Sequence, residues 1–324
     1  MKRKLKRIFL FLLYLSAVLL LLLCVLELSY RKYWFDFYAA EDLYLNENIN
    51  HGDGSRIVFF GDSYTAGGQY ISFLRKDSPG KEIINAGIPG TSIREAALIA
   101  KNRIGKYRPE DIVIQVYPGN DFTDLHPLTG AGIPALKVLY LRLSESFRSL
   151  AWLNYKMGQF RSKPSHNPKT DSGFNALTYN PRQKELFRAD PGYLHDILEL
   201  KGHQTSVVQE WWAYFDELQS ETDADTRIWI LLIPHCAQVS REYADRMEQL
   251  GGLRPEDHPD PSQTPLYRCF LDSCKVRNIL WIDPLPAFRK ADSMGCKVYL
   301  ENDFHLSPEG DSVLARFLKQ TLQP

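Results

Sequence analysis

An uninterrupted apolar run lies near the start of the chain. Residues 8–26 carry no charge, and at about 1.5 Å per residue a helix of this length reaches about 28 Å, enough to cross the hydrocarbon core of a membrane. Five basic residues precede the run, which places the N-terminus in the cytoplasm by the positive-inside rule. We predict a basic cytoplasmic tail at residues 1–7, a transmembrane anchor at 8–28 and a juxtamembrane linker at 29–54.

A cleaved signal peptide is the alternative interpretation of this segment. Such a peptide has a shorter apolar region and a cleavage site of small residues, and no Ala-x-Ala-like site follows Leu26. An uncleaved anchor is therefore favoured, with the rest of the chain outside the cytoplasm. The aromatic residues that follow suit the interfacial belt of a membrane protein: Tyr30, Tyr33, Trp34, Phe35, Phe37 and Tyr38.

From about residue 55 onward, short apolar runs alternate with longer amphipathic stretches. Five runs are mainly apolar without regular polar alternation, as are strands buried on both faces of a parallel sheet: Arg56–Phe60, Glu82–Asn85, Asp111–Tyr117, Arg227–Ile233 and Ile279–Ile282. Helical stretches lie between and after them, among them Thr91–Tyr107, Gln204–Gln219 and Pro308–Leu322, the last with Ser307 as its N-cap. This alternation predicts one three-layer α/β domain over residues 55–324.

The stretch from about residue 122 to 203 shows no strand pair and is predicted to be an insertion. Its part from Leu136 to Phe160 has helical periodicity, whereas Ser162–Pro181 is polar, contains proline and asparagine, and is predicted to be a mobile loop. Insertions at the carboxyl edge of an α/β sheet commonly carry specificity. A lid or substrate-binding surface and a plain helical packing layer both stay open.

Charge and cysteine content narrow the function. Without the basic residues of the N-terminal tail, 34 basic residues remain against 39 acidic ones, and no basic run is present, so nucleic acid is not an expected partner. Four cysteines lie outside the anchor, an even number that could pair in an oxidising compartment or remain as buried free thiols: Cys236, Cys269, Cys274 and Cys296. They lack the clustered spacing of a zinc site, and we expect neither a metal nor a cofactor.

Four short motifs supply the chemistry. Gly61–Ser63 follows the first predicted strand, Asn85–Gly87 ends the second, Gly119–Asp121 follows the third, and Asp303–His305 lies close to the C-terminus. Open α/β sheets bind their ligands beyond the carboxyl ends of the strands. The first three motifs should therefore meet at one edge of the sheet.

These residue types suit acyl transfer, which needs a hydroxyl nucleophile, a base beside it and donors for the oxyanion. Ser63 is the candidate nucleophile and His305 the candidate base, with Asp303 as the group that orients the imidazole. The backbone amides of Ser63 and Gly87, together with the side-chain amide of Asn120, are the expected oxyanion hole.

On these motifs the chain resembles the SGNH hydrolase superfamily, also called GDSL esterases and lipases, over residues 55–322. The resemblance implies a flavodoxin-like three-layer fold, with the motif serine, glycine, asparagine and histidine in the roles just given. Two departures stand out: Pro118 occupies the usual glycine position of the third motif, and Asn302 stands where the last motif usually has its aspartate. Whether Asp303 or Asn302 orients His305 is therefore open.

Other motifs are weaker. The chain has no Gly-x-Ser-x-Gly sequence, so the nucleophile elbow of α/β-hydrolases is not supported. The glycines of Gly130–Ala135 do not make a dinucleotide fingerprint. Such a fingerprint needs a strand before it and a helix that starts within it, and Pro134 and the residues that precede Gly130 are incompatible with both. The remaining histidines are expected at the surface: His51, His126, His166, His195, His203, His235 and His258.

The sequence predicts a membrane-anchored, extracytoplasmic serine esterase that hydrolyses acyl esters through an acyl-Ser63 intermediate. O-acetyl esters of carbohydrates are the expected substrates, on the strength of the resemblance and the location. Two alternatives remain: an O-acyltransferase of the same fold that modifies a cell-surface glycan, and a non-catalytic, anchored glycan-binding or assembly protein. The expected partners are an acylated small molecule or glycan and the membrane.

Overall fold

The computed structural model describes residues 2–47, 49, 54–126, 133–158, 173–254 and 264–322. Contacts divide the chain into two compact units. The first comprises Met1–Tyr38 and Ala135–Arg161, and the second comprises Ala39–Pro134 and Ser162–Pro324. The predicted insertion therefore contributes to both units.

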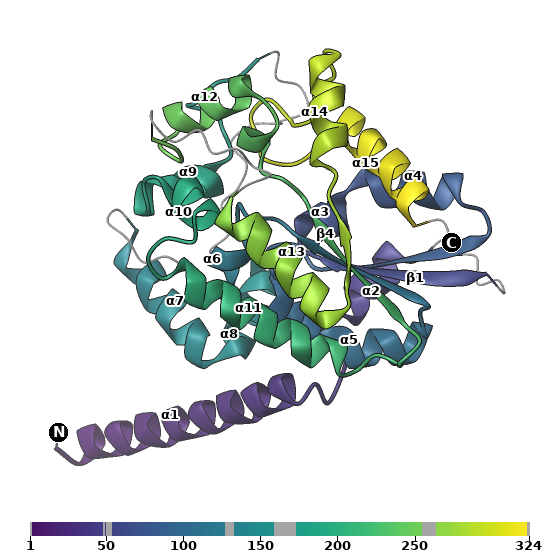
Figure 1. The fold of residues 1–324 in the computed structure, drawn as a ribbon. Coiled ribbons are helices and arrows are strands. Elements are labelled where there is room, and N and C mark those ends of the chain that lie inside the picture. Colours follow the sequence, from purple (N-terminus) through teal and green to yellow (C-terminus); the bar gives the residue numbers. More distant parts are fainter. Residues whose placement is uncertain are drawn as a thin grey trace. The chain divides into compact units, whose positions relative to one another are not determined.

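The second unit is built on a five-stranded parallel sheet with the strand order β2-β1-β3-β4-β5 (Figure 1). Its strands are β1 Ser55–Gly61, β2 Lys81–Gly87, β3 Asp111–Val116, β4 Arg227–Leu232 and β5 Leu280–Ile282. Every residue of β3 is buried, including the polar Asp111 and Gln115, as expected for a central strand covered on both faces. This is the strand order of flavodoxin-like folds, so the predicted fold class is confirmed.

Helices cover both faces of the sheet. Figure 1 shows α4 (Gln69–Asp77), α14 (Leu285–Ser293) and α15 (Pro308–Thr321) on one side, and α5 (Ile93–Tyr107), α11 (Gln204–Gln219) and α13 (Pro265–Arg277) on the other. The other described helices of this unit are α2 Ala39–Leu45, α3 Ser63–Gly67, α6 Asp121–Leu125, α9 Pro181–Ala189, α10 Tyr193–Leu198, α12 Arg241–Gln249 and the 3₁₀ turn η1 Cys236–Gln238. The three layers agree with the prediction.

The predicted N-cap of the last helix is present. Ser307 Oγ accepts a hydrogen bond from Gly310 N at 3.0 Å, and Pro308 opens α15. This cap fixes where the chain turns from the preceding loop into the helix. That loop carries His305.

The first unit contains α1 (Lys2–Arg31), α7 (Ala135–Ser146) and α8 (Arg148–Met157). The carboxylate of Glu27 in α1 accepts from the backbone amides of Arg148 and Ser149, at 3.0 and 2.8 Å, and so caps the start of α8. The helical periodicity predicted from Leu136 onward thus corresponds to two helices, separated at Phe147.

Three of the aromatic residues predicted to lie at a membrane interface are buried. Tyr30, Phe37 and Tyr38 are buried, and Phe37 packs edge-on against Trp152 with ring centroids 5.1 Å apart. In this unit they form an internal cluster, because the helical part of the insertion supplies ring partners that no local pattern reveals. Trp34 is exposed, as is the adjoining Phe35.

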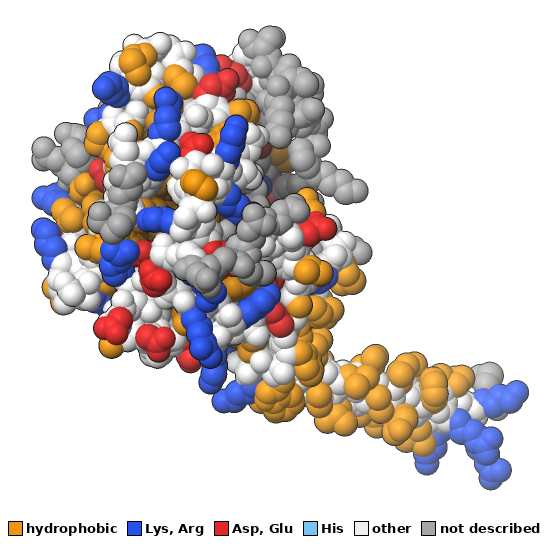
Figure 2. Space-filling model, turned by 90° about the vertical axis from the view of Figure 1, so that its right-hand side faces the viewer, with side chains coloured by type: hydrophobic (Ala, Val, Ile, Leu, Met, Phe, Trp, Pro, Cys, Tyr) orange, Lys and Arg blue, Asp and Glu red, His pale blue; other side chains and the backbone are white. Residues whose placement is uncertain are grey.

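Among the described residues, one helix is long and apolar enough to cross a membrane, the segment Arg3–Arg31, in which an 18-residue stretch has a mean hydropathy of 3.0. Figure 2 shows hydrophobic side chains along α1 and basic side chains at its N-terminal end. By length and composition this helix fits a membrane anchor or a signal sequence.

The predicted domain boundaries remain predictions. The two compact units defined by contacts begin and end at other residues. Residues 39–45, placed in the juxtamembrane linker, form helix α2 of the second unit, where buried Asp42 pairs with Arg103 and Lys106. Residues 162–172 of the predicted mobile loop lie outside the described residues. The rest of the predicted loop leads into α9.

Candidate active site

The loops at the carboxyl ends of the strands bring the motif residues together. Ser63 opens α3 directly after β1, and His305 lies in the loop between α14 and α15. Ser63 Oγ is 2.8 Å from His305 Nε2, and His305 Nδ1 is 2.5 Å from Asp303 Oδ1. With the Nδ1 proton directed at Asp303, Nε2 is free to accept a hydrogen bond from the serine hydroxyl.

The turn that presents Ser63 is held from both sides. The Asp62 side chain accepts a hydrogen bond from Tyr64 N at 2.9 Å and so caps α3, while Asp62 N donates to Gln115 Oε1 at 3.1 Å. These bonds fix the backbone on either side of Ser63. The serine itself is partly exposed.

The histidine loop is equally well fixed. His305 N donates to Asp303 Oδ1 at 3.1 Å, and the Tyr64 hydroxyl donates to the carbonyl of Phe304. The ring of Tyr64 also lies 5.2 Å from the imidazole, centroid to centroid. The His305 side chain keeps 31% of its surface exposed, so a substrate can reach it.

Asp303 carries a negative charge in this setting. Burial by itself would raise the pKa of its carboxyl, but hydrogen bonds from His305 and Asn180 outweigh burial and hold the pKa below its ordinary value. A charged carboxylate beside Nδ1 stabilises the imidazolium that forms when His305 takes a proton.

The side chain of Asn302 binds the segment before α9. Its side-chain oxygen accepts from Asn175 N at 2.6 Å, and its Nδ2 donates to the carbonyl of Gly173 at 2.8 Å. Asn302 therefore holds the segment before α9, and the side chain that contacts the imidazole is that of Asp303.

The expected oxyanion donors already have acceptors in this structure. Gly87 N donates to Asn85 Oδ1 at 3.0 Å, and Asn120 Nδ2 donates to Asp62 Oδ2 at 2.9 Å and to Asp124 Oδ2 at 3.1 Å. The amide of Ser63 is at the first position of α3, where an N–H has no acceptor within the helix. The oxyanion hole stays a prediction, and it requires two of its donors to exchange partners.

Gly87 also has a packing role. A Cβ at this position would lie 2.5 Å from Ala66 N and 2.9 Å from Thr65 Cβ, because α3 passes directly over the end of β2. Only glycine permits this approach, which keeps the start of α3 against the sheet.

Around Asn120 lies a group of carboxylates that the sequence did not single out. Burial raises the pKa of Asp62, Asp121 and Asp124, and Asp124 pairs with Arg182 of α9. Asp121 Oδ2 accepts from Tyr117 N at 2.8 Å, within the turn after β3. These groups fix the Asn120 side chain between Asp62 and Asp124.

One predicted surface histidine is wrong. His235 is fully buried and stacks on Tyr117 with ring centroids 5.6 Å apart. Burial lowers the pKa of His235 to about 3, so the ring is neutral under physiological conditions. The residue follows the buried end of β4, and a single histidine beside a strand gives no sign of which way its ring turns. His126 and His203 are exposed as expected.

The cysteines do not pair. All five are free thiols, and Cys236 and Cys274 are buried. Among the residues that the structure describes, no group of three or more His, Cys, Asp or Glu side chains is placed to hold a metal ion.

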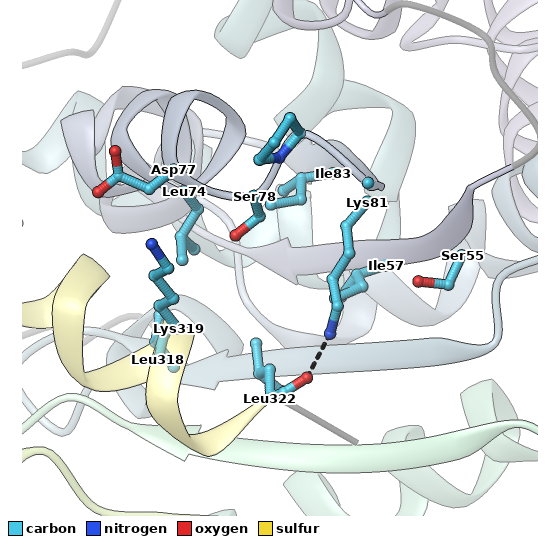
Figure 3. Close-up of a pocket in the computed structure, with 12 residues that line it drawn as sticks. Ser55, Ile57, Leu74, Asp77, Ser78, Lys81, Ile83, Leu318, Lys319 and Leu322 are labelled. Atoms are coloured by element: carbon cyan, nitrogen blue, oxygen red, sulfur yellow. Dashed lines mark hydrogen bonds between the residues drawn. The ribbon is translucent and has the colours of Figure 1, made fainter.

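A pocket of about 280 Å³ lies at the opposite edge of the sheet (Figure 3). It is lined by the first residues of β1 and β2, including Ser55 and Lys81, and by Leu318 and Leu322 at the end of the chain's last helix. The Lys81 ammonium group donates to the carbonyl of Leu322. This pocket is separate from the motif residues.

The fold and the four motifs define an α/β domain of the kind that the resemblance to SGNH hydrolases implies. No family model matches the chain, and no curated protein matches it. Among solved structures it is similar to a lipolytic protein of the G-D-S-L family from Veillonella parvula, with 12% identity, 83% of this chain and 98% of that chain covered, and a TM-score of 0.42.

Two further similarities concern hydrolases. The acetylxylan esterase of Geobacillus stearothermophilus has 15% identity to this chain, with 84% of this chain and 96% of that chain covered and a TM-score of 0.38. An alpha/beta hydrolase from the metagenome of Lake Arreo has 15% identity, with coverage of 84% and 97% and a TM-score of 0.39.

Proposed function

We propose that this protein is a serine ester hydrolase of the SGNH type. The observation that carries the proposal is the continuous chain of contacts from Ser63 Oγ to His305 Nε2 and from His305 Nδ1 to Asp303 Oδ1, at 2.8 and 2.5 Å. Nucleophile, base and orienting carboxylate are in hydrogen-bond reach of one another, which is the arrangement that activates a serine.

The acylation step follows from this geometry. Ser63 Oγ attacks the ester carbonyl carbon as His305 Nε2 takes the hydroxyl proton, and the carbonyl oxygen becomes an oxyanion. When the tetrahedral intermediate collapses, the bond to the alcohol oxygen breaks and His305 returns the proton to that oxygen. The products are the free alcohol and an acyl group esterified to Ser63.

Deacylation repeats these steps with water. His305 takes a proton from the water as its oxygen attacks the acyl carbon, and the second collapse returns that proton to Ser63 Oγ. The carboxylic acid leaves and the serine hydroxyl is regenerated. Asp303 remains charged throughout, holding the Nδ1 proton.

The oxyanion is stabilised by the Ser63 amide together with Gly87 N and Asn120 Nδ2. A developing oxyanion is a stronger acceptor than the neutral carboxamide oxygen of Asn85, which favours transfer of the Gly87 hydrogen bond. Asn120 has two N–H groups, so one can stay on Asp62 while the other turns from Asp124 to the substrate.

Substrate and location complete the proposal. Helix α1 anchors the protein with its N-terminus in the cytoplasm, and the α/β unit lies on the outer side, where acetylated carbohydrates of the cell surface are within reach. O-acetyl esters of such glycans are the proposed substrates. This part rests on the motif resemblance and on an N-terminal helix that is long and apolar enough to span a membrane.

The test uses the full-length protein in detergent micelles with 4-nitrophenyl acetate as an activated acetyl ester. Wild type should release nitrophenol, whereas Ser63→Ala and His305→Ala should not, and equal turnover by all three would refute the proposal. Adding acetyl-accepting glycans separates hydrolysis from transfer, because a transferase yields acetylated sugar with little free acetate.

Alkaline extraction of membranes tests the anchor, since an integral protein stays in the pellet.

A further inference from the structure

The start of α9 contacts the Asp303–His305 pair through the side chain of Asn180. Asn180 is the N-cap of α9, and its Oδ1 accepts from the backbone amides of Arg182 and Gln183 at 3.0 and 3.3 Å. Its Nδ2 points the other way and donates to Asp303 Oδ2 at 2.9 Å. One carboxamide thus caps a helix of the insertion and binds the orienting carboxylate.

This contact complements the one that Asp303 makes with the imidazole. Asp303 Oδ1 accepts from Nδ1 and from the backbone amide of His305, and Oδ2 accepts from Asn180. A carboxylate held through both oxygens cannot rotate about its Cβ–Cγ bond without breaking a hydrogen bond. Asn180 therefore fixes the plane in which Asp303 meets Nδ1.

Backbone contacts set Asn180 in place relative to the histidine loop. Asn180 N donates to the carbonyl of Asn302 at 3.0 Å, and Asn175 N donates to the side chain of Asn302 at 2.6 Å. The segment before α9 and the segment before His305 are therefore joined along several residues.

The start of α9 is also tied to the opposite half of the site. Arg182 pairs with Asp124, and Asp124 Oδ2 accepts from Asn120 Nδ2 at 3.1 Å. Asn180 thus contacts the histidine loop, and Arg182, two residues later, is linked through Asp124 to Asn120. This second tie keeps α9 from shifting along the site.

We propose that Asn180 is a positioning residue for the Asp303–His305 pair, so that the insertion serves the chemistry of the site directly. The proposal rests on the proposed ester-hydrolase function. It assigns to the insertion a role different from a lid or a passive packing layer. It also accounts for a polar side chain that reaches across 123 positions of sequence to Asp303.

Helix capping is the competing explanation for Asn180, and substitutions can separate the two. Asn180→Asp keeps the capping oxygen, loses the N–H donor and places a second carboxylate against Asp303. Asn180→Ala loses both functions. Thr264→Ala is the matched control, since Thr264 caps α13 by accepting from Tyr267 N at 3.3 Å and, like Asn180, is followed by proline at the first helical position.

The experiment measures kcat, KM and the pH–rate profile of full-length wild type and these variants with 4-nitrophenyl acetate, together with thermal unfolding. Asn180→Ala and Thr264→Ala should both lower Tm. Only the Asn180 variants should lower kcat, by roughly ten- to a hundredfold with KM little changed, as expected for loss of a hydrogen bond to a charged group.

Asn180→Asp should also move the acidic limb of the profile to higher pH. Among the described residues, the titratable side chains near His305 are those of Asp303, Asp62 and Tyr64, and burial raises the pKa of Tyr64 so that its hydroxyl stays neutral. An added carboxylate beside Asp303 favours the protonated imidazole, which cannot act as base. The NMR signal of the His305 Nδ1 proton should shift in both Asn180 variants, a readout that does not depend on turnover.

Asn180 variants with the kcat, pH profile and Nδ1 proton signal of wild type would overturn the proposal. If Ser63→Ala is inactive in the same series, the ester-hydrolase function stands and only the role of Asn180 fails. If Ser63→Ala is as active as wild type, the ester-hydrolase function itself fails, and the Nδ1 signal alone then tests Asn180.

Discussion

The hydroxyl oxygen of Ser63 lies 2.8 Å from Nε2 of His305, although 242 positions separate the two residues in the chain. Ser63 is delivered by the turn after the first strand, and His305 by the loop before the last helix. The sequence around each turn predicts no contact between the two. The parallel sheet brings them together at its carboxyl edge, at a distance suited to proton transfer.

Replacing Asp303 by Asn should lower kcat by roughly 10²- to 10⁴-fold while leaving the fold intact. An amide at this position cannot stabilise the imidazolium, and it can hold the wrong tautomer of His305. The measurement is kcat with an activated acetyl ester, alongside Tm.

Asn302→Ala is the natural companion to Asp303→Asn. Asn302 Oδ1 and Nδ2 bind residues 175 and 173, so we expect this variant to have a lower Tm than wild type and to keep most of its kcat. A large loss of kcat in Asn302→Ala, with Asp303→Asn as active as wild type, would mean that the orienting residue has been assigned wrongly.

His235 should make the protein less stable as the pH falls. Its folded-state pKa is about 3 against an ordinary value of 6.5, so between these values the unfolded state binds more protons and stability rises with pH. This contribution is fully present above pH 6.5 and declines as the pH falls towards about 3, by at most about 1.4 kcal/mol per pH unit.

Unfolding by urea at several pH values checks this expectation. His235→Asn should flatten the dependence in that window, whatever its effect on stability at neutral pH. The same substitution at exposed His203 is the control and should leave the slope as in wild type. An unchanged slope in His235→Asn would contradict the assignment of a neutral, buried ring.

Gly87→Ala should destabilise the protein by about 1–3 kcal/mol and reduce activity. The new Cβ would meet Ala66 N at 2.5 Å, so α3 has to move away from the end of β2 and take Ser63 with it. Thermal unfolding and kcat measure the two effects. Gly105→Ala, in α5, is the control, because a Cβ there meets nothing within 4 Å; equal behaviour of the two variants would show that the close approach at Gly87 is not needed.

Much of the fold was predictable because its signals are local. Continuous apolar runs identify all five strands to within a residue or two, and the Ser307-Pro308 pair marks the start of α15. The three motifs at the carboxyl ends of β1, β2 and β3 were predictable as neighbours for the same reason, since parallel strands place these ends at one edge.

The rest depends on contacts between distant segments, which no local pattern encodes. The side chain of Asn302 is hydrogen-bonded to residues 173 and 175, whereas the side chain of Asp303 contacts the imidazole. The bonds of Gly87 N and Asn120 Nδ2 to neighbouring side chains depend on rotamers, and so does the burial of His235. Asn180 did carry a signal, because an asparagine before proline at a helix start is a typical N-cap, but its second partner lies 123 positions away.

The central claim is that Ser63 is an activated nucleophile, and labelling with a fluorophosphonate tests it most directly. Such a reagent forms a phosphorus–oxygen bond to an activated serine and releases fluoride, and peptide mass analysis locates the adduct. We predict that full-length wild type is labelled at Ser63, that His305→Ala is labelled far more slowly, and that Ser63→Ala is not labelled. Labelling of Ser63→Ala at the wild-type rate, or ester hydrolysis by a wild-type protein whose Ser63 remains unlabelled, would contradict the claim.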